Sequence, residues 1–309
     1  MSRGSIGYLQ PALGLVALLL VALAPAARAV AGPAVDLAQG CGQPAPATAP
    51  AAVEVAGQRR GLIVSVPADY RPAEPHALVI GFHGRTSPNA TVRRYYDLER
   101  HAGLPTIFVY PSGLRAEHGG YSWAEPDDLP ESLRDYALFD AIVTLLARTY
   151  CLDPGRIFAV GHSLGASFVN DLGCARGDVL RAIATLAGGF RRAECRGEVA
   201  ALILHNPNDR LVDFGYGLRT RDAYRAANGI AGEGRQVTLA GFACQRYGEA
   251  GIADPVLWCP HTRDRTRSGR YYPHHWPRET GAAIMGFFQS LPAGATTASA
   301  LAARAGPEG

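Results

Sequence analysis

A serine flanked by glycines stands where a buried strand is expected to turn into a helix. Residues 161–165 read Gly-His-Ser-Leu-Gly, which matches the pattern G-x-S-x-G. An apolar run over 156–160 precedes them, and a segment rich in small residues follows. Glycines permit the strained turn that exposes a serine hydroxyl, and a helix N-terminus favours negative charge beside it. This setting predicts that Ser163 is a nucleophile rather than part of an ordinary Gly-Ser turn.

A serine hydroxyl needs a base that takes its proton, and the base needs an acid that orients it. On strand-to-helix turns of this kind, the acid follows the serine in the chain and the histidine follows the acid. Residues 204–209 break from a strand into a loop, which places Asp209 at the carboxyl edge of the sheet. Asp209 is therefore predicted to be the acid, with Asp213 as the alternative, and a capping or turn role is the competing interpretation.

Three histidines compete for the role of base. His205 precedes the predicted acid, so its position argues against it. His274 and His275 lie just before the last predicted helix, where a loop can bring an imidazole to the serine. His261 follows the preceding strand, where a polar surface role is the favoured interpretation. The order of residues alone leaves His274 and His275 both open.

Two backbone N–H groups that point at one spot are needed to hold the oxyanion formed during acyl transfer. Leu164, directly after the nucleophile, is expected to supply one of them. The loop over 82–85, Phe-His-Gly-Arg, follows a buried strand, and Arg85 is expected to supply the other. His83 in the same loop precedes the serine in the chain, which argues against a role as base.

Strands and helices alternate along the chain, as the spacing of its apolar residues indicates. Such alternation predicts a single α/β domain, with a mostly parallel sheet and helices on both faces. Ligands of such a sheet bind at the carboxyl ends of its strands. The expected strands are 60–66, 76–82, 106–110, 156–161, 182–186, 200–204, 237–242 and 256–259, and the expected helices are 91–102, 131–150, 164–174, 219–227 and 279–291.

The N-terminus has the features of a secretory signal over residues 1–29. Arg3 precedes an apolar run over 13–23, and Ala-Arg-Ala at 27–29 resembles a signal-peptidase site. The run is short for a membrane span, so we expect an exported protein, extracellular or periplasmic, without a membrane anchor after cleavage. Residues 30–52 are expected to form a leader segment, residues 53–291 the α/β domain, and residues 292–309 a disordered tail.

Composition narrows the classes of partner. The net charge of +3 falls to +1 without Arg3 and Arg28, which indicates no nucleic-acid partner. The motifs call for neither a metal nor an organic cofactor, and they indicate no particular oligomeric state. Six cysteines in an exported chain favour disulfides, whose pairing the count leaves open, and the absence of a C-x-x-C pair argues against zinc. They are Cys41, Cys151, Cys174, Cys195, Cys244 and Cys259.

Taken together, these motifs resemble the secreted feruloyl esterases and polyhydroxybutyrate-depolymerase-like esterases, which are related to carbohydrate esterase family one. The resemblance covers residues 41–291 and implies the α/β-hydrolase fold. It is carried by GFHGR at 81–85, VYPSG at 109–113, GHSLGAS at 161–167, CARGDVLRAIATLAG at 174–188, LHNPNDRLV at 204–212 and HHWP at 274–277.

The resemblance also implies roles for individual residues. LHNPNDRLV is similar to the family's I-H-G-x-x-D-x-x-V, which puts the acid on Asp209. HHWP is similar to its H-x-W-P, which puts the base on His274 and not on His275. His162 and Trp276 are then candidates for substrate contact, with Trp276 either a wall of the site or an anchor of its loop.

The chain departs from the family pattern at several places. Asn206 stands where the family usually has glycine, Pro273 stands where glycine commonly precedes the histidine, and 263–272 resembles an insertion. Family members often have a cysteine near the position of Gly229, which this chain lacks. Because Cys259 is present instead, the resemblance implies that Cys244 pairs with Cys259.

The activity that the resemblance implies is hydrolysis of a carboxylic ester through an acyl-enzyme, most simply a feruloyl ester on plant cell-wall polysaccharide. Within the same chemistry, a polyester such as polyhydroxybutyrate or an acetylated xylan is the alternative substrate. Two other classes remain. One is a non-catalytic binding protein on a hydrolase fold, and the other is an acyltransferase, in which an alcohol replaces water.

Overall fold

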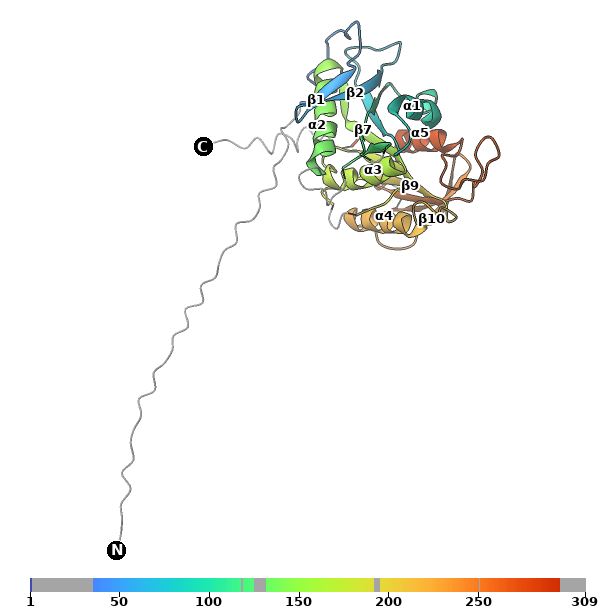
Figure 1. The fold of residues 1–309 in the computed structure, drawn as a ribbon. Helices are drawn as coiled ribbons and strands as arrows, with labels where there is room; N and C mark the ends of the chain where they lie inside the picture. The colour runs from blue at the N-terminus through green and yellow to red at the C-terminus, as the bar shows by residue number, and fades with distance from the viewer. Residues whose placement is uncertain (2–35, 118, 125–131, 192–194, 250, 295–309) are drawn as a thin grey trace. The chain divides into compact units, whose positions relative to one another are not determined.

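One mixed sheet of ten strands organises the described residues of the computed structural model (Figure 1). Its six central strands run parallel, and an antiparallel pair flanks them on each side. In order across the sheet, the strands are β1 (Ala52–Val55), β2 (Gln58–Ser65), β4 (Thr106–Pro111), β3 (His76–Phe82), β7 (Leu152–His162), β8 (Ala182–Leu186), β9 (Ala200–His205), β12 (Val256–Pro260), β11 (Phe242–Tyr247) and β10 (Arg235–Leu239).

The described part of the chain comprises residues 1, 36–117, 119–124, 132–191, 195–249 and 251–294. The expected signal peptide, apart from residue 1, lies outside it, as does the expected tail from residue 295 onward. The chain divides into two units, residues 1–32 and 33–309, and all the elements belong to the second. No helix within the described ranges is long and apolar enough to cross a bilayer.

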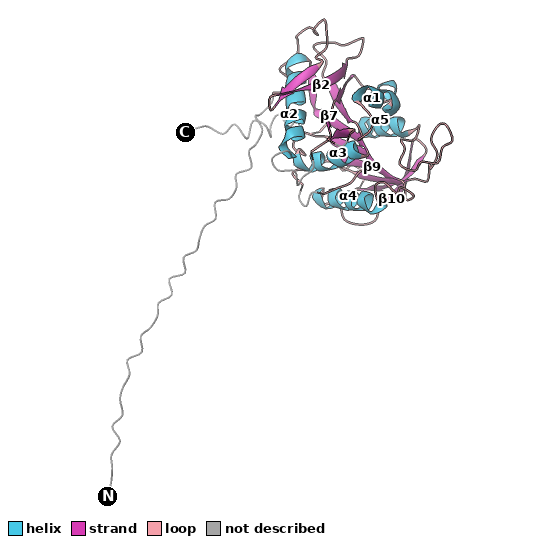
Figure 2. Cartoon of the chain, viewed as in Figure 1, coloured by secondary structure: helices cyan, strands magenta, loops and turns pink. Residues whose placement is uncertain are grey.

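Helices cover both faces of the sheet (Figure 2). On one face pack α2 (Ser132–Thr149), α3 (Leu164–Ala175) and α4 (Phe214–Ala227). On the other face pack α1 (Asn89–Tyr96) and α5 (Thr280–Ser290). Because successive side chains of a strand point to opposite faces, the apolar run of β3 divides between the two layers. Leu78 and Ile80 join the first core and Val79 joins the second, which confirms the predicted mostly parallel sheet with helices on both faces.

Several elements differ from the expected ones; β7 begins at Leu152 instead of 156, and α4 at Phe214 instead of 219. The helix expected over 91–102 ends at Tyr96, because Asp97 takes a left-handed φ of 54°, and a short 3-10 turn, η1 (Glu99–His101), follows. The single strand expected over 237–242 is instead divided by a hairpin turn, with 237–239 at the end of β10 and Phe242 at the start of β11. Ala240 and Gly241 both have positive φ, 45° and 79°, and they join β10 to β11. Positive φ at both central residues suits the twist of a two-residue hairpin.

All six cysteines are paired. Cys244 on β11 joins Cys259 on the neighbouring strand β12, as the family resemblance implied. Cys41 joins Cys151, just before β7, and so ties the segment 36–52 to the sheet. Leu37 of this segment is buried in the same core as the apolar residues of α2. The third disulfide joins Cys174 at the end of α3 to Cys195.

Candidate active site

Ser163 stands on a sharp turn between β7 and α3, at the carboxyl edge of the central strands. Its backbone has φ 58° and ψ −126°, a strained conformation for a residue with a side chain. The glycines on either side are required by packing. A Cβ on Gly165 would collide with the carbonyl of Phe82, and one on Gly161 would collide with the carbonyl of Gly165. The turn therefore lies tightly against β3 and presents the serine hydroxyl outward.

A chain of hydrogen bonds joins Ser163 to two residues far away in the sequence. Nε2 of His274 lies 2.7 Å from Oγ of Ser163, and Nδ1 of His274 lies 2.6 Å from Oδ2 of Asp209. With Nδ1–H donating to the carboxylate, Nε2 is left to accept the serine proton. The structure thus brings together the residues that the sequence singled out as nucleophile, base and acid, from the loops after β7 and β9 and before α5.

The competing histidines have other partners. Nε2–H of His275 donates to the carbonyl of Arg263 at 2.8 Å, so its ring is held by the backbone. His261 is buried, so the expected surface role is wrong, and its ring packs edge-on against Phe242, with 5.6 Å between the ring centroids. His274 is therefore the one of the three that hydrogen-bonds the serine.

Asp209 is held as a carboxylate. Its Oδ1 accepts the N–H groups of Leu211 at 2.8 Å and Val212 at 3.1 Å. Burial by itself raises the pKa of this carboxyl, but the hydrogen bonds from His274 and from the backbone outweigh burial and lower the pKa below its usual value. Asp213, the alternative acid, instead caps α4 by accepting the N–H of Gly215 at 2.8 Å.

The loop after β3 lies against the serine. A Cβ on Gly84 would lie 3.3 Å from Cβ of Ser163. His83 fixes this loop from within: Nδ1–H donates to the carbonyl of Gly84, and Nε2 accepts the N–H of Gly113, both at 2.8 Å. Burial lowers the pKa of His83, so the ring stays neutral. Arg85 follows at the cavity wall, and Leu164 begins α3, where its N–H has no carbonyl partner within the helix.

His162 and Trp276 support the loop that carries His274. Nε2–H of His162 donates to the backbone carbonyl of His274 at 2.9 Å, and Nδ1 accepts the hydroxyl of Tyr95 at 3.1 Å. Burial lowers the pKa of His162 to about 3, so the ring stays neutral. Trp276 stacks on Tyr96, with 4.1 Å between the ring centroids. Both line the cavity, but the ring nitrogens of His162 are already engaged, and Trp276 is both a loop anchor and a wall.

The hydroxyl of Ser163 opens into a cavity of about 990 Å³. This volume is at the upper end of the usual range for small-molecule sites. Within the described residues, no group of three His, Cys, Asp or Glu side chains is placed to hold a metal ion. Six aromatic side chains line the cavity: Tyr95, Trp123, Phe168, Tyr216, Tyr272 and Trp276.

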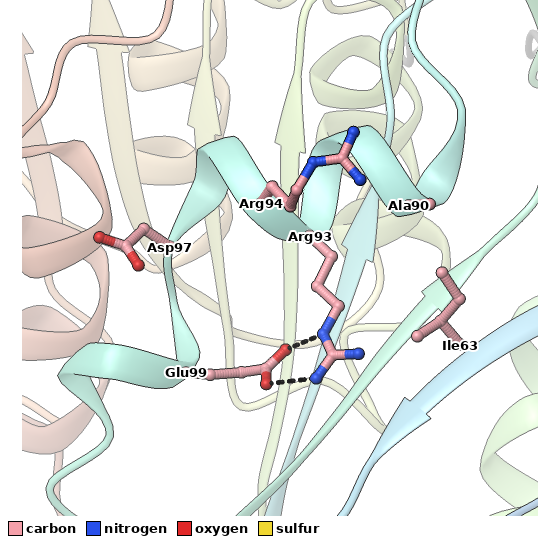
Figure 3. A pocket seen from close by; sticks show the side chains of 6 residues that line it. All are labelled: Ile63, Ala90, Arg93, Arg94, Asp97 and Glu99. Carbon is pink, nitrogen blue, oxygen red and sulfur yellow. Dashed lines mark hydrogen bonds and ion pairs between the residues drawn. The ribbon is translucent and has the colours of Figure 1, made fainter.

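A smaller hollow of about 470 Å³ lies beside α1 (Figure 3). Two arginines and two carboxylates line it, namely Arg93, Arg94, Asp97 and Glu99. Arg93 and Glu99 pair with each other at 2.7 Å, and both also bind the hydroxyl of Ser65. It contains neither a nucleophile nor a histidine, and its charged pair is satisfied within the fold. We therefore assign this ion pair to the packing of α1 on the sheet.

Two residues that hold parts of the site in position were not predicted from the sequence. Tyr95, which binds His162, lies 67 residues away from it, and no local pattern connects the two. Asp264 accepts hydrogen bonds from Asn206 and Asn208 on the loop of the acid. Two departures from the family pattern could have indicated this contact, namely Asn206 in place of glycine and the insertion at 263–272. A buried amide side chain requires a hydrogen-bond partner, and an inserted segment can supply one.

Acid is expected to destabilise the fold through His261. Burial, aided by the positive charge of Arg263, lowers the pKa of this ring to about 4, whereas an unfolded histidine titrates near about 6.5. Between these values the unfolded chain binds a proton that the folded chain does not. The free energy of unfolding should therefore decrease as the pH is lowered from about 6.5 to about 4, by up to about 1.4 kcal/mol per pH unit. Urea unfolding across this window should show a shallower fall for His261→Gln; an unchanged slope would refute this role.

Sequence relatives of the chain are named as esterases. No family model matches it. Feruloyl esterase C of Emericella nidulans is 30% identical over 179 residues, which cover 55% of this chain and 62% of that protein. The chain thus spans less than two thirds of the length of that relative. Feruloyl esterase D of Neurospora crassa is 26% identical over 238 residues, which cover 69% of this chain and 76% of that protein.

Solved structures share the architecture at low sequence identity. An acetyl xylan esterase from Aspergillus awamori superposes with a TM-score of 0.54 at 13% identity, over 74% of this chain and 94% of that one. A carboxylesterase from Bacillus cereus superposes with a TM-score of 0.54 at 12% identity, over 74% and 93% of the two chains. At such identities the likeness speaks for the fold. The chain therefore has the α/β-hydrolase fold and is related in sequence to feruloyl esterases C and D.

Proposed function

We propose that this protein is a serine hydrolase of carboxylic esters that works through an acyl-enzyme. One observation carries the proposal. The hydrogen-bonded chain from Asp209 through His274 to Ser163 ends on a strained turn that faces a large cavity. An activated serine hydroxyl in such a setting performs acyl transfer, and the naming of the sequence relatives as esterases supports the same reaction.

In the proposed mechanism, Oγ of Ser163 attacks the ester carbonyl carbon while Nε2 of His274 accepts its proton. Asp209 holds the resulting imidazolium in place through Nδ1–H. The backbone N–H groups of Leu164 and Arg85 donate to the oxyanion of the tetrahedral intermediate. His274 then gives its proton to the departing alcohol. A water molecule, activated by the same histidine, finally releases the acid and restores the serine.

The proposed substrate class is a feruloyl ester of plant cell-wall polysaccharide. An aromatic acyl group suits a cavity lined by six aromatic side chains, because aromatic rings gain from offset or edge-on contacts with one another. The names of the sequence relatives support the same acyl group. We further propose export from the cytoplasm, since three disulfides form readily in an oxidising compartment.

A panel of three substrates tests this proposal. Methyl ferulate, p-nitrophenyl acetate and an emulsion of polyhydroxybutyrate are compared by kcat/KM or, for the polymer, by the release of acid. We expect methyl ferulate to be hydrolysed faster than the emulsion. Hydrolysis of p-nitrophenyl acetate alone would mean that the proposed acyl group is acetyl rather than feruloyl. Rapid clearing of the emulsion would mean that the substrate is a polyester. No hydrolysis of any of the three would refute the esterase.

Loss of the His162 ring is expected to slow turnover rather than weaken binding. His162→Ala removes the donor that holds the carbonyl of His274, so the base loses its fixed orientation. We expect kcat to fall about 10-fold or more, with a smaller change in KM. Tyr95→Phe removes only the outer hydrogen bond and should cost less. Steady-state kinetics on methyl ferulate measures both; a change confined to KM would assign His162 to substrate contact instead.

A further inference from the structure

A small hairpin stands beside the catalytic histidine. Arg265 and Tyr271 form an antiparallel bridge, and the N–H of Thr266 donates to the carbonyl of Arg270 at 2.9 Å. The turn closes with the N–H of Gly269 donating to the carbonyl of Thr266, also at 2.9 Å. These residues fall within the segment that resembles an insertion. We refer to residues 265–271 as the 265–271 hairpin.

The foot of this hairpin is fixed to the loop that carries the acid. Asp264 accepts the side-chain amide of Asn206 at 2.8 Å and that of Asn208 at 3.1 Å. The carbonyl of Asp264 accepts the N–H of Tyr272 at 2.7 Å, which closes the base of the hairpin. Asn206 is buried, so this anchor lies inside the fold. The hairpin therefore has a defined position relative to Asp209.

The tip of the hairpin forms part of the cavity wall. Thr266, Arg267 and Ser268 line the same cavity as Ser163. The wall includes two further arginines, Arg85 and Arg191, against one described carboxylate, Asp171, which is buried and accepts the N–H of Arg191. Arg85 and Arg267 are exposed and form no ion pair with any carboxylate in the described residues. The described wall thus carries an excess of positive charge.

The position of the hairpin shows which part of an ester it faces. His274 must pass its proton to the departing alcohol. The ring of Tyr272, at the base of the hairpin, lies 6.0 Å from the ring of His274, and both line the same cavity as the tip of the hairpin. We infer that the alcohol part of the substrate lies on the side of the cavity that this segment lines. A guanidinium in that place favours an anion, and its planar donor set matches a carboxylate, which is the anionic group of an acidic sugar.

We propose that the 265–271 hairpin is a specificity element for the alcohol side of the ester, and that Arg267 on it binds a carboxylate, as an acidic sugar would present. This proposal rests on the proposed esterase function. It predicts that esters with an anionic alcohol part are hydrolysed in preference to neutral ones. Because Arg267 is exposed, water and salt screen the contact, and the expected preference is modest, about 3-fold.

A matched pair of esters isolates this charge. 4-Acetoxybenzoate and its methyl ester carry the same acetyl group on the same ring, and their carboxyl group is a free anion in the first and methylated in the second. The release of acetate is measured, because the methyl ester contains a second ester bond. We expect Arg267→Gln to lower the anion-to-neutral ratio of kcat/KM about 3-fold, and Arg267→Glu to lower it further. Sodium chloride at about 0.5 M should lower the wild-type ratio in the same direction. Arg270→Gln is the control, since Arg270 lies on the same hairpin but over the ring of Tyr272, outside the cavity lining.

Each outcome decides a different question. If the ratio is unchanged in both Arg267 variants while the neutral ester is still hydrolysed, the carboxylate contact is wrong and the esterase stands. The contact is also wrong if Arg267→Glu slows both esters equally, because the residue then supports structure, or if Arg270→Gln lowers the ratio as much. If the wild-type protein hydrolyses neither ester nor methyl ferulate, the proposed function itself fails.

Discussion

Replacement of Ser163 by alanine is expected to lower turnover on any hydrolysed ester by a factor of order 10⁴ to 10⁶. Without Oγ no acyl-enzyme forms, and His274 has no hydroxyl proton to accept. What rate remains comes from the oxyanion donors and from binding alone. The fold should survive, because alanine keeps the Cβ and the backbone N–H of this residue, which donates to the carbonyl of Leu186 at 3.0 Å.

Two measurements test this expectation. Release of ferulate under saturating methyl ferulate gives kcat, and circular dichroism verifies the fold of the variant. Ser290→Ala, at an exposed position at the end of α5, is the matched control and should turn over like wild type. A folded Ser163→Ala protein with near-wild-type turnover would remove the nucleophile from the mechanism and with it the proposed function.

His274→Ala is expected to lose about 10³-fold or more in turnover, and His275→Ala far less. The two rings are neighbours in the chain but point to different partners. His274 connects Ser163 to Asp209, whereas His275 donates to the carbonyl of Arg263. Only the first arrangement allows a proton to move from the serine to a ring that a carboxylate stabilises.

The same assay on both single variants separates the alternatives, with folding verified for each. The opposite ranking would move the base to His275. Small and equal losses in both would return the role to His261, which the structure places against Phe242. Either result would mean that the hydrogen bond between His274 and Ser163 is not the one used in the reaction.

The sequence predicted those parts of the fold that depend on residues close together in the chain. The bounds of β3 and β8 agree with the prediction, because a strand buried on both faces has a nearly continuous apolar sequence. The turn at Ser163 was predictable for a related reason, since its glycines are imposed by contacts within a few residues and with β3. Apolar spacing does not encode the left-handed φ of Asp97, which ends α1 early.

Other parts of the site depend on contacts between distant segments. The spacing of apolar residues could not choose between His274 and His275 as the base. That choice required the resemblance of HHWP to the family's H-x-W-P. In the structure that choice follows from where the backbone points each ring. The hairpin at Ala240 and Gly241 was readable in principle, since a glycine between two alternating runs is a turn signal. The hydrogen bond from Tyr95 to His162 joins α1 to the turn at Ser163, and the sequence of neither segment predicts this contact.

The anchor at Asp264 has a consequence for protein engineering. Because the amides of Asn206 and Asn208 hold the foot of the 265–271 hairpin, the hairpin and the acid loop form one transplantable module. A graft of residues 263–272 alone into a relative with glycine at the position of Asn206 would leave Asp264 without its buried donor. The grafted segment would then lose its orientation over the cavity. A transfer that also carries residues 206–208 keeps both halves of the contact, and with them the geometry of the recipient's own acid.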